Sequence, residues 1–313
     1  MTLPLLGADA IEALGPTGAV DALEAVLRGG LDPETAPARH HLAVPGGELL
    51  LMPATTRRVT GVKIAGVAPD NPANGLPRIT GSYLLLDAPT LLPLALLDGA
   101  ALTTLRTPAV SALAIRYLTG PVVRHLVLFG TGPQAHGHLA AVLAERRVER
   151  VTVVGRTPHR TDELVERARR LGIDAQAGKA DGSAVATADL VLCCTTSATP
   201  LFDGTLVPDG ATVVAVGSHT ADAREVDTAL VSRSRVVVES RAAALSEPGD
   251  LLIPIAEGAF RAQDIAGNLA ELVTGGCDGE VTDGTGRPRF FKSVGAGWED
   301  LAVAEAVHRA STA

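Results

Sequence analysis

The feature that most constrains the fold is a regular alternation of short apolar runs with helical stretches from Val122 onward. The apolar runs are Leu126–Phe129, Val151–Val154, Leu190–Cys194, Thr212–Val216 and Val236–Val238. Between them, Pro133–Arg147 and Pro158–Leu171 carry apolar residues at helical spacing. Strands that alternate with helices form right-handed crossovers, which build a parallel sheet covered on both faces. We therefore predict a doubly wound α/β domain.

The segments at both ends of the chain are less regular. The elements predicted there are a helix over Thr17–Arg28, strands over Leu49–Met52, Val59–Val67 and Tyr83–Leu86, a helix over Pro108–Leu118 with Thr107 as its N-cap, and a helix over Trp298–Arg309. Gly120–Pro121 marks the expected boundary into the doubly wound half. We expect the C-terminal helix to return to the first domain, so the predicted domains are residues 1–120 plus about 292–313, and residues 121–291.

Composition and charge exclude several classes of protein. The 313 residues hold 27 Lys and Arg against 35 Asp and Glu, a formal net charge of −8, with one Trp, two Tyr and five Phe. Proteins that bind nucleic acid are usually basic and stack bases on aromatic rings, so no nucleic-acid partner is expected. No uncharged apolar run reaches about 18 residues, as a membrane span requires. The N-terminus also lacks the basic segment of a signal peptide, so we expect a cytoplasmic protein without a membrane partner.

Neither the cysteines nor the neighbouring histidines indicate a metal site. Cys193 and Cys194 are adjacent and Cys277 is alone, which fits neither a disulfide framework nor a metal-binding spacing. His40 and His41 are also adjacent, and successive residues of a strand point to opposite faces. Both are therefore not expected to bind one ion, and we predict no metal.

A glycine-rich turn follows the first strand of the predicted parallel sheet. The strand ending at Phe129 continues as Gly130-Thr131-Gly132-Pro133-Gln134-Ala135, and a helix follows. In a dinucleotide-binding fold the first Gly makes the tight turn, the second lets the backbone approach the pyrophosphate, and a small third residue permits helix–strand packing. N–H groups at the start of the helix then bind the phosphates. The alternative is an ordinary strand-to-helix turn, but the strand–turn–helix context favours nucleotide binding.

The end of the second strand indicates which dinucleotide is bound. A carboxylate there would bind the ribose 2′-OH of NAD, whereas arginine accommodates the 2′-phosphate of NADP. The segment reads Val154-Gly155-Arg156-Thr157-Pro158-His159-Arg160 and contains no carboxylate. NADP(H) is therefore favoured and NAD(H) remains possible. The alternative is that Arg156 and Arg160 are hydrated surface residues.

Two cationic residues of the first domain are candidates for an anion site. Lys63 lies between Val62 and Ile64 in a strand, so it faces solvent or a cleft if those two face the core; a hydrated strand lysine is the alternative. Arg106 precedes the expected cap Thr107. A cation beside the positive end of a helix is unfavourable unless an anion lies between them, which predicts a bound carboxylate or phosphate. The alternative is a hydrated, exposed arginine.

Several motifs together resemble one family. They are Val62-Lys63-Ile64, the turn from Asp70-Asn71-Pro72 to Gly75-Leu76-Pro77, Leu96-Leu97-Asp98-Gly99, the segment Leu102-Thr103-Thr104-Leu105-Arg106-Thr107-Pro108-Ala109-Val110-Ser111-Ala112, the turn Gly130–Ala135, Gly217-Ser218-His219-Thr220, Arg224-Glu225-Val226-Asp227 and Phe291-Lys292-Ser293-Val294-Gly295. Each motif alone is weak, but their combination is specific. The sequence resembles the ornithine cyclodeaminase/μ-crystallin family over nearly the whole chain.

The resemblance implies a homodimer of two-domain subunits. A central Rossmann-type domain would bind the dinucleotide, and an α+β domain built from both chain ends would bind substrate and form the dimer. The resemblance assigns the substrate carboxylate to Arg39 and Arg106, catalysis to Lys63, and a further substrate contact to Met52. Its implied cofactor contacts are Arg106, Thr107, Gly130, Thr131, Gly132, Pro133, Gln134, Arg156, Thr157, Arg160, Thr195, Thr196, Ser197, Val216, Gly217, Ser218, Ser293 and Gly295.

One departure from the family pattern bears on the reaction. Cyclodeaminases carry an Asp after the fifth strand that binds the terminal amine of ornithine, and His219 occupies that position here. Asp222 is a weaker candidate for this role, and His219 is a candidate for sharing proton transfer. We therefore expect a reductase that uses NAD(P)H on a cyclic imino acid, such as Δ1-pyrroline-2-carboxylate, or a related 2-imino or 2-oxo acid. The alternatives are a cyclodeaminase of ornithine or lysine with catalytic NAD, an amino-acid dehydrogenase, and a non-catalytic ligand-binding member of the fold.

Overall fold

The computed structural model describes residues 3–179, 181–277 and 286–312. The chain divides into a first unit, which comprises the chain up to Ala109 and from Ala296 onward, and a second unit over Val110–Gly295. The division falls inside a helix rather than at Gly120–Pro121, because the second half of that helix packs with the parallel sheet that follows it.

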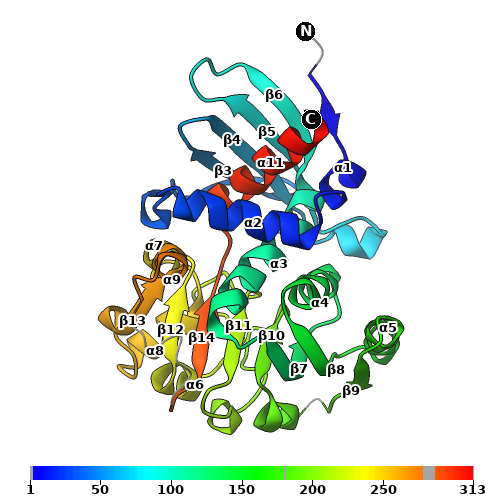
Figure 1. The fold of residues 1–313 in the computed structure, drawn as a ribbon, viewed down its shortest axis with the longest axis vertical. Helices are drawn as coiled ribbons and strands as arrows, with labels where there is room; N and C mark the ends of the chain where they lie inside the picture. The colour runs from blue at the N-terminus through cyan, green and yellow to red at the C-terminus, as the bar shows by residue number, and fades with distance from the viewer. Residues whose placement is uncertain (1–2, 180, 278–285, 313) are drawn as a thin grey trace. The chain divides into compact units, whose positions relative to one another are not determined.

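The first unit is built on a six-stranded sheet. Its elements are β1 (Leu5–Leu6), α1 (Ala8–Glu12), α2 (Gly15–Arg28), β2 (His40–Val44), β3 (Gly47–Thr55), β4 (Val59–Val67), β5 (Ile79–Asp87), β6 (Pro93–Asp98), the first half of α3 (Gly99–Leu118) and α11 (Gly297–Thr312). The strand order is β1-β6-β5-β4-β3-β2, antiparallel except for the β1–β6 pair. Helix α11 packs on β3, β4 and β5 and against α2 (Figure 1).

The prediction for β4 was right in its bounds, and it left open which face of the strand meets the core. Val59, Gly61, Lys63 and Ala65 are buried, whereas Ile64 is exposed. Alternation therefore places Lys63 on the buried face of the strand and not toward solvent. Lys63 is buried and Ile64 is exposed because the sheet packs its Lys63 side against α11.

Helix α3 begins eight residues before Thr107, so the predicted N-cap was wrong. The Asp98 carboxylate accepts hydrogen bonds from the N–H groups of Ala100 (2.9 Å) and Ala101 (3.0 Å), which caps the helix there. Pro108 lies inside α3. A Thr-Pro pair is typical of a helix start, which explains the misreading. Arg106 therefore lies within a helix, and the argument that placed it at a positive helix end does not hold.

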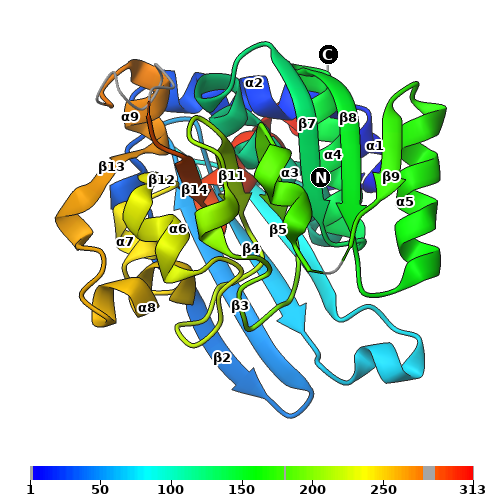
Figure 2. The same ribbon diagram turned by 90° about the horizontal axis from the view of Figure 1, so that it is seen from below.

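The second unit is a parallel sheet with helices, as the alternation predicted. Its elements after α3 are β7 (Val122–Phe129), α4 (Pro133–Glu145), β8 (Arg147–Val154), α5 (Pro158–Arg170), β9 (Asp174–Ala177), β10 (Leu190–Cys193), β11 (Thr212–Ala215), α6 (Thr228–Arg233), β12 (Arg235–Val238), α7 (Arg241–Ala244), α8 (Gly249–Ala256), β13 (Ile265–Asn268), α9 (Leu269–Thr274) and β14 (Arg289–Lys292). The order is β13-β12-β14-β11-β10-β7-β8-β9, and every described pair is parallel. Helix α5 lies beside β8 and β9 (Figure 2).

The strand order of this sheet reverses beside β7. From β7 the chain proceeds outward to β8 and β9, and then crosses to β10 and β11 on the other side. In open α/β sheets, ligands bind outside the carboxyl ends of the strands at such a reversal. The sheet therefore places its candidate ligand site where β7 and β10 end.

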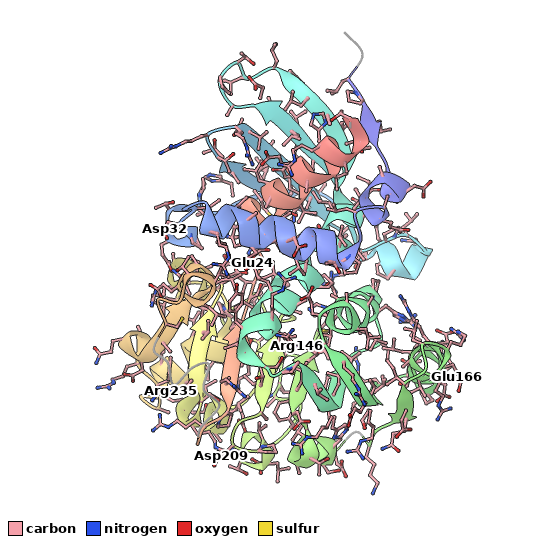
Figure 3. All side chains as sticks on the ribbon, viewed as in Figure 1. Glu24, Asp32, Arg146, Glu166, Asp209 and Arg235 are labelled. Carbon is pink, nitrogen blue, oxygen red and sulfur yellow. The ribbon has the colours of Figure 1, made fainter. Side chains whose placement is uncertain are left out.

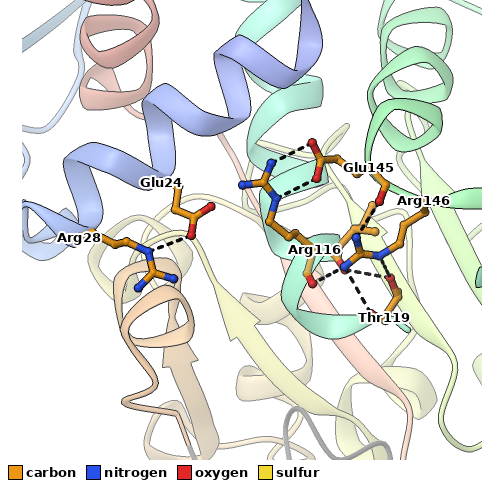
Figure 4. Close-up of polar contacts among 7 residues, drawn as sticks. Glu24, Arg28, Arg116, Thr119, Glu145 and Arg146 are labelled. Atoms are coloured by element: carbon orange, nitrogen blue, oxygen red, sulfur yellow. Dashed lines mark hydrogen bonds and ion pairs between the residues drawn. The ribbon is translucent and has the colours of Figure 1, made fainter. Parts of the chain in front are cut away.

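Arginine side chains connect the second half of α3 to the end of α4. Arg116 makes a two-point ion pair with Glu145 at 2.8 and 2.9 Å (Figure 4). Arg146 donates to Thr119 Oγ1 at 3.0 Å and to the carbonyls of Ile115, Arg116 and Thr119, which are among the last carbonyls of the helix (Figure 4). The Ile115 carbonyl also accepts from the N–H of Thr119 at 3.0 Å, so Arg146 adds a charged donor at a helix end where backbone carbonyls run out of N–H partners.

Exposed ion pairs, each between two residues of one helix, lie on the surface of both units. On α2 of the first unit, Glu24 and Arg28 form an ion pair one helical turn apart at 2.8 Å (Figure 4). On α5 of the second unit, the labelled Glu166 points away from the sheet and pairs with Arg169 (Figure 3). Such exposed pairs contribute little to stability.

None of the helices in the described part of the chain combines the length and hydropathy that crossing a bilayer requires.

We expect Arg146→Met to lower the free energy of unfolding by about 2 kcal/mol, because it removes a charged donor from several carbonyls at once. Arg147→Met is the matched control, since Arg147 is exposed and pairs only with exposed Glu149 among the described contacts. Urea unfolding of both variants measures the difference. Equal stability of the two variants would show that Arg146 does not support the helix end.

Candidate active site

Lys63 is buried in a row of side chains that crosses three strands of the first unit. Met52 of β3 and Tyr83 of β5 lie directly opposite Lys63 in the strand register, so all three point to the same face. Lys63 is 3% exposed, and Met52 and Tyr83 are also buried. A lysine in such surroundings requires a compensating partner, because a buried unpaired ammonium is costly.

The partner of Lys63 is a carboxylate from the C-terminal helix. Asp300 Oδ2 lies 2.8 Å from Lys63 Nζ, and Asp300 Oδ1 accepts a hydrogen bond of 3.0 Å from Arg106 Nε. Arg106 Nη1 donates to Glu299 Oε2 at 2.8 Å. All four charged side chains are buried. Lys63 Nζ also donates to Thr103 Oγ1 of α3 at 3.3 Å. The first unit thus holds one ammonium and one guanidinium around a single aspartate.

The charges in this cluster shift each other's pKa values. Burial and the neighbouring Arg106 lower the pKa of Lys63 to about 8, although Asp300 opposes the shift. Burial by itself would raise the pKa of Asp300, but Arg106 and Lys63 outweigh it and lower that pKa. Burial, with a further contribution from Asp300, raises the pKa of Tyr83 well above its ordinary value. A lysine of pKa about 8 can give up a proton near neutral pH, as a general acid must.

The other residues predicted for substrate binding lie in different places. Met52 lies beside Lys63 in the sheet. Arg39 lies just before β2, two strands away from β4, and is partly buried. His40 is exposed, and His41 pairs with Glu48 at 2.6 Å. The described part of the chain holds no group of three potential metal ligands.

The residues predicted to bind the dinucleotide in the second unit follow the carboxyl ends of five parallel strands. These strands are β7, β8, β10, β11 and β14, which end at Phe129, Val154, Cys193, Ala215 and Lys292. Because parallel strands end at the same edge, the turns that follow them gather there. Arg106 and Thr107 were also predicted as cofactor contacts, and they belong to the first unit.

The glycine-rich turn has the geometry that a bound pyrophosphate requires. Gly130 has φ +111°, and a Cβ atom there would lie 2.4 Å from the carbonyl oxygen of Cys194 after β10. Only glycine fits such a position. Gly132 is the N-cap of α4 and provides no side-chain cap, and a Cβ atom on it would meet no atom within 4 Å. Gln134 Oε1 is buried without a hydrogen-bond partner among the described residues. The turn thus fits a dinucleotide.

The end of β8 is also shaped by a glycine. A Cβ atom on Gly155 would lie 2.6 Å from Thr131 Cγ2, so its absence lets the glycine-rich turn approach this strand. Arg156 and Arg160 are exposed, and neither forms an ion pair with another described residue. Thr157 is the N-cap residue of α5, without a side-chain cap bond.

Buried Glu225 ties together two loops of this edge, and the sequence analysis assigned it no function. Its Oε1 accepts from the N–H and the hydroxyl of Thr195, both at 2.7 Å, and its Oε2 accepts from the N–H of Gly217 at 2.7 Å. A Cβ atom on Gly217 would lie 1.9 Å from the Thr195 carbonyl oxygen, so glycine is required. The loops after β10 and β11 are therefore held at one carboxylate.

Further buried charges lie at the ends of neighbouring strands. Lys292 Nζ pairs with Asp250 Oδ2 at 2.9 Å and donates to the carbonyl of Ser218 at 2.7 Å. Glu239 accepts from the Ser293 hydroxyl and from the N–H of Gly295 at 3.0 Å. These contacts fix Ser218, Ser293 and Gly295, which were predicted as cofactor contacts.

His219 and Asp222 are both exposed. His219 Nδ1 lies 3.4 Å from the carbonyl oxygen of Gly217. In the loop after β10, the Ser197 hydroxyl donates to the carbonyl of Thr199 and accepts from its N–H. The part of His219 and of Asp222 in catalysis stays a prediction.

The sequence analysis missed the carboxylates that organise both units. They are Glu299 and Asp300 of α11, and Glu225, Glu239 and Asp250 of the second unit. Buried Lys292, the partner of Asp250, was also missed. One signal was available in the sequence: Asp250 is a charged residue within the apolar segment Gly249–Ala256. A charge within an apolar segment indicates a buried, paired group.

Comparison with known proteins agrees with this architecture. A sequence model of the ornithine cyclodeaminase/mu-crystallin family matches residues 19–313. The chain is 36% identical over 260 residues to a Delta(1)-pyrroline-2-carboxylate reductase of Colwellia psychrerythraea strain 34H, which covers 82% of each protein. The structure of Thermococcus litoralis Delta(1)-pyrroline-2-carboxylate reductase in complex with NADH and L-proline matches with a TM-score of 0.92 and 30% identity, over 99% of this chain and 98% of that one.

An archaeal alanine dehydrogenase dimer with bound NAD also matches, with a TM-score of 0.92 and 25% identity over 100% of this chain and 97% of that one. The family match spans both units, and the reductase and dehydrogenase structures share the fold over nearly the whole length. The α/β fold with a Rossmann-type sheet and the resemblance read from the sequence motifs are thereby confirmed. The chain belongs to the ornithine cyclodeaminase/mu-crystallin family.

Proposed function

We propose that this chain is an enzyme that reduces Δ1-pyrroline-2-carboxylate, or a closely related cyclic imino acid, with a reduced nicotinamide cofactor. The observation that carries the proposal is the buried Lys63–Asp300–Arg106 cluster, in which a lysine of pKa about 8 lies beside a guanidinium. A proton donor next to a carboxylate-binding group is what reduction of an imino acid requires. The reductases among its relatives support the same substrate class.

Each residue of the site has a distinct part in this reaction. Arg106, together with Arg39, binds the carboxylate of the imino acid, and Met52 supplies an apolar contact. Lys63 donates a proton to the imine nitrogen. The nicotinamide supplies the hydride when it is bound. Fixing the substrate by its carboxylate contributes to the rate because the reacting groups no longer have to find their orientation.

The dinucleotide belongs at the carboxyl edge of the parallel sheet. The turn Gly130–Gln134 is assigned to the pyrophosphate, and Thr195–Ser197, Val216–Ser218, Ser293 and Gly295 to the rest of the cofactor. Arg156, Thr157 and Arg160 are assigned to a 2′-phosphate, which makes NADPH the preferred reductant. The support is that both arginines are exposed and no carboxylate stands at the end of β8.

A homodimer is supported by the face of the first sheet that points away from Lys63. Leu42 and Ile64 are 54% and 43% exposed. The register places both on one face with Leu49 and Leu51. Contiguous exposed apolar residues mark association surfaces, and this face can pair with its copy about a twofold axis.

All three cysteines are unpaired, which supports a reducing compartment such as the cytoplasm.

Reduction is preferred over cyclodeamination because His219 stands where a cyclodeaminase carries an aspartate. An imidazole binds the terminal ammonium of ornithine poorly, and Asp222 is exposed. Release of ammonia from ornithine or lysine with catalytic NAD, without consumption of NADPH, would favour the cyclodeaminase instead. Binding without turnover of any imino, oxo or amino acid would favour a ligand-binding protein.

We expect Lys63→Met to lower kcat/KM for Δ1-pyrroline-2-carboxylate by about a thousandfold, because the proton donor is lost. Binding of NADPH, followed by its fluorescence, should change less than about twofold, since Lys63 is assigned only to the imino acid. Lys179→Met is the control, as Lys179 is exposed. Full activity of Lys63→Met would remove Lys63 from the mechanism.

The rate of reduction should fall at alkaline pH. Lys63 must be protonated to act as an acid, and its pKa of about 8 lies below the ordinary value of 10.5. We therefore expect kcat/KM to decrease about tenfold per pH unit above about pH 9. Oxidation of the product amino acid should show the opposite dependence, because it requires unprotonated Lys63. A reduction rate that stays constant to pH 10, with the protein still folded, would contradict this role.

We expect Arg156→Ser to raise the Kd for NADPH about tenfold and to leave that for NADH nearly unchanged, because only NADPH carries the 2′-phosphate. Arg170→Ser, in the last turn of α5, is the matched loss of an exposed arginine. Titration of cofactor fluorescence measures both constants. A wild-type protein that binds NADH more tightly than NADPH would refute the assignment.

A further inference from the structure

We propose that Asp300 is a positioning residue of the active site, whose carboxylate bridges Lys63 and Arg106 and thereby fixes the proton donor relative to the carboxylate-binding group. The inference rests on the proposed function for the roles of Lys63 and Arg106. It adds a residue of the C-terminal helix that the sequence motifs did not assign to any role.

The geometry of the bridge is specific to Asp300. Each of its two oxygens contacts a different cation, Oδ2 contacting Lys63 Nζ at 2.8 Å and Oδ1 contacting Arg106 Nε at 3.0 Å. Glu299, the preceding residue, contacts Arg106 Nη1. Asp300 is fully buried, as is Glu299. A buried carboxylate with two charged partners has little freedom to move. It therefore fixes the position of Lys63 relative to Arg106.

The bridge joins three separate parts of the chain. Lys63 comes from β4, Arg106 from α3 and Asp300 from the first turn of α11. Gly297 lets α11 start close to the sheet, because a Cβ atom there would lie 2.6 Å from the carbonyl oxygen of Pro53 on β3. The start of the helix is thus set against the strand next to β4, which brings Asp300 to the Lys63 row.

The charges that face Lys63 determine how Asp300 affects its proton. Arg106 from α3 disfavours the ammonium, and Asp300 and Glu299 from α11 favour it. Thr103 accepts a hydrogen bond from it, and Tyr83 of β5 lies opposite it in the register. Loss of the Asp300 charge would leave the ammonium beside Arg106 with less compensation. Lys63 would then lose its proton at lower pH, while the bridge to Arg106 would be broken.

Direct titration of Lys63 tests the bridge independently of turnover. The chain has only three lysines, Lys63, Lys179 and Lys292. Selective labelling with 13C-lysine therefore gives three Cε signals, which Lys63→Arg and Lys179→Arg assign. We expect the Lys63 signal of the full-length wild-type protein to titrate near pH 8 and that of Asp300→Asn to titrate at least one pH unit lower. The alkaline limb of kcat/KM should move by the same amount.

Two further variants separate charge from position. Asp300→Glu keeps the charge but displaces it by one methylene, so the Lys63 titration should stay near that of the wild type while kcat/KM falls at least tenfold. Glu305→Gln is the control within α11, because Glu305 pairs with exposed Arg58 and not with the cluster; it should leave both readouts unchanged. Circular dichroism reports whether each variant is folded, and the Lys292 signal reports on the second unit alone.

An unchanged Lys63 titration in folded Asp300→Asn, or wild-type kcat/KM in Asp300→Glu, would overturn the proposal. If Asp300→Asn does not fold, Asp300→Glu alone decides through the split between titration and turnover. A wild-type protein that does not reduce the imino acid would refute the proposed function, and the Lys63 titrations would still show whether Asp300 controls that proton.

Discussion

The burial of ionised side chains is the constraint on which the candidate site depends. A buried ammonium or guanidinium is unfavourable unless carboxylates and hydrogen bonds compensate it. In the first unit, Asp300 and Glu299 compensate Lys63 and Arg106. In the second unit, Asp250 compensates Lys292. The carboxylates therefore determine where the cations can lie, and the functional groups are held by the same contacts that allow them to be buried.

The second unit uses buried carboxylates for a different purpose. Glu225 binds backbone N–H groups of two loops, and Glu239 does so for the loop after β14. Loops at the carboxyl end of a parallel sheet would otherwise depend on their own short-range contacts for their shape. A carboxylate that accepts bonds from two loops keeps both in place, and Gly217 allows the close approach to Thr195 and Glu225 that this requires.

The sequence predicted the parallel sheet well because each strand and helix leaves a local pattern. It failed where the local pattern was ambiguous. Thr107-Pro108 has the features of a helix start, yet Asp98 caps a longer helix that passes through Pro108. Strand β9 has one buried residue in four, so it carried no apolar run to detect. Lys63 was placed on a strand correctly, but alternation alone does not say which face meets the core.

By itself, the sequence determined the strand–helix alternation, the glycine-rich turn and the family, because these depend on neighbours along the chain. Only the tertiary structure decided that Asp300, 194 residues after Arg106, is the partner of that arginine and of Lys63. It also decided that Glu225 joins two loops. Contacts between distant residues depend on how the strands are ordered and how α11 docks, and a periodic pattern carries no information about either.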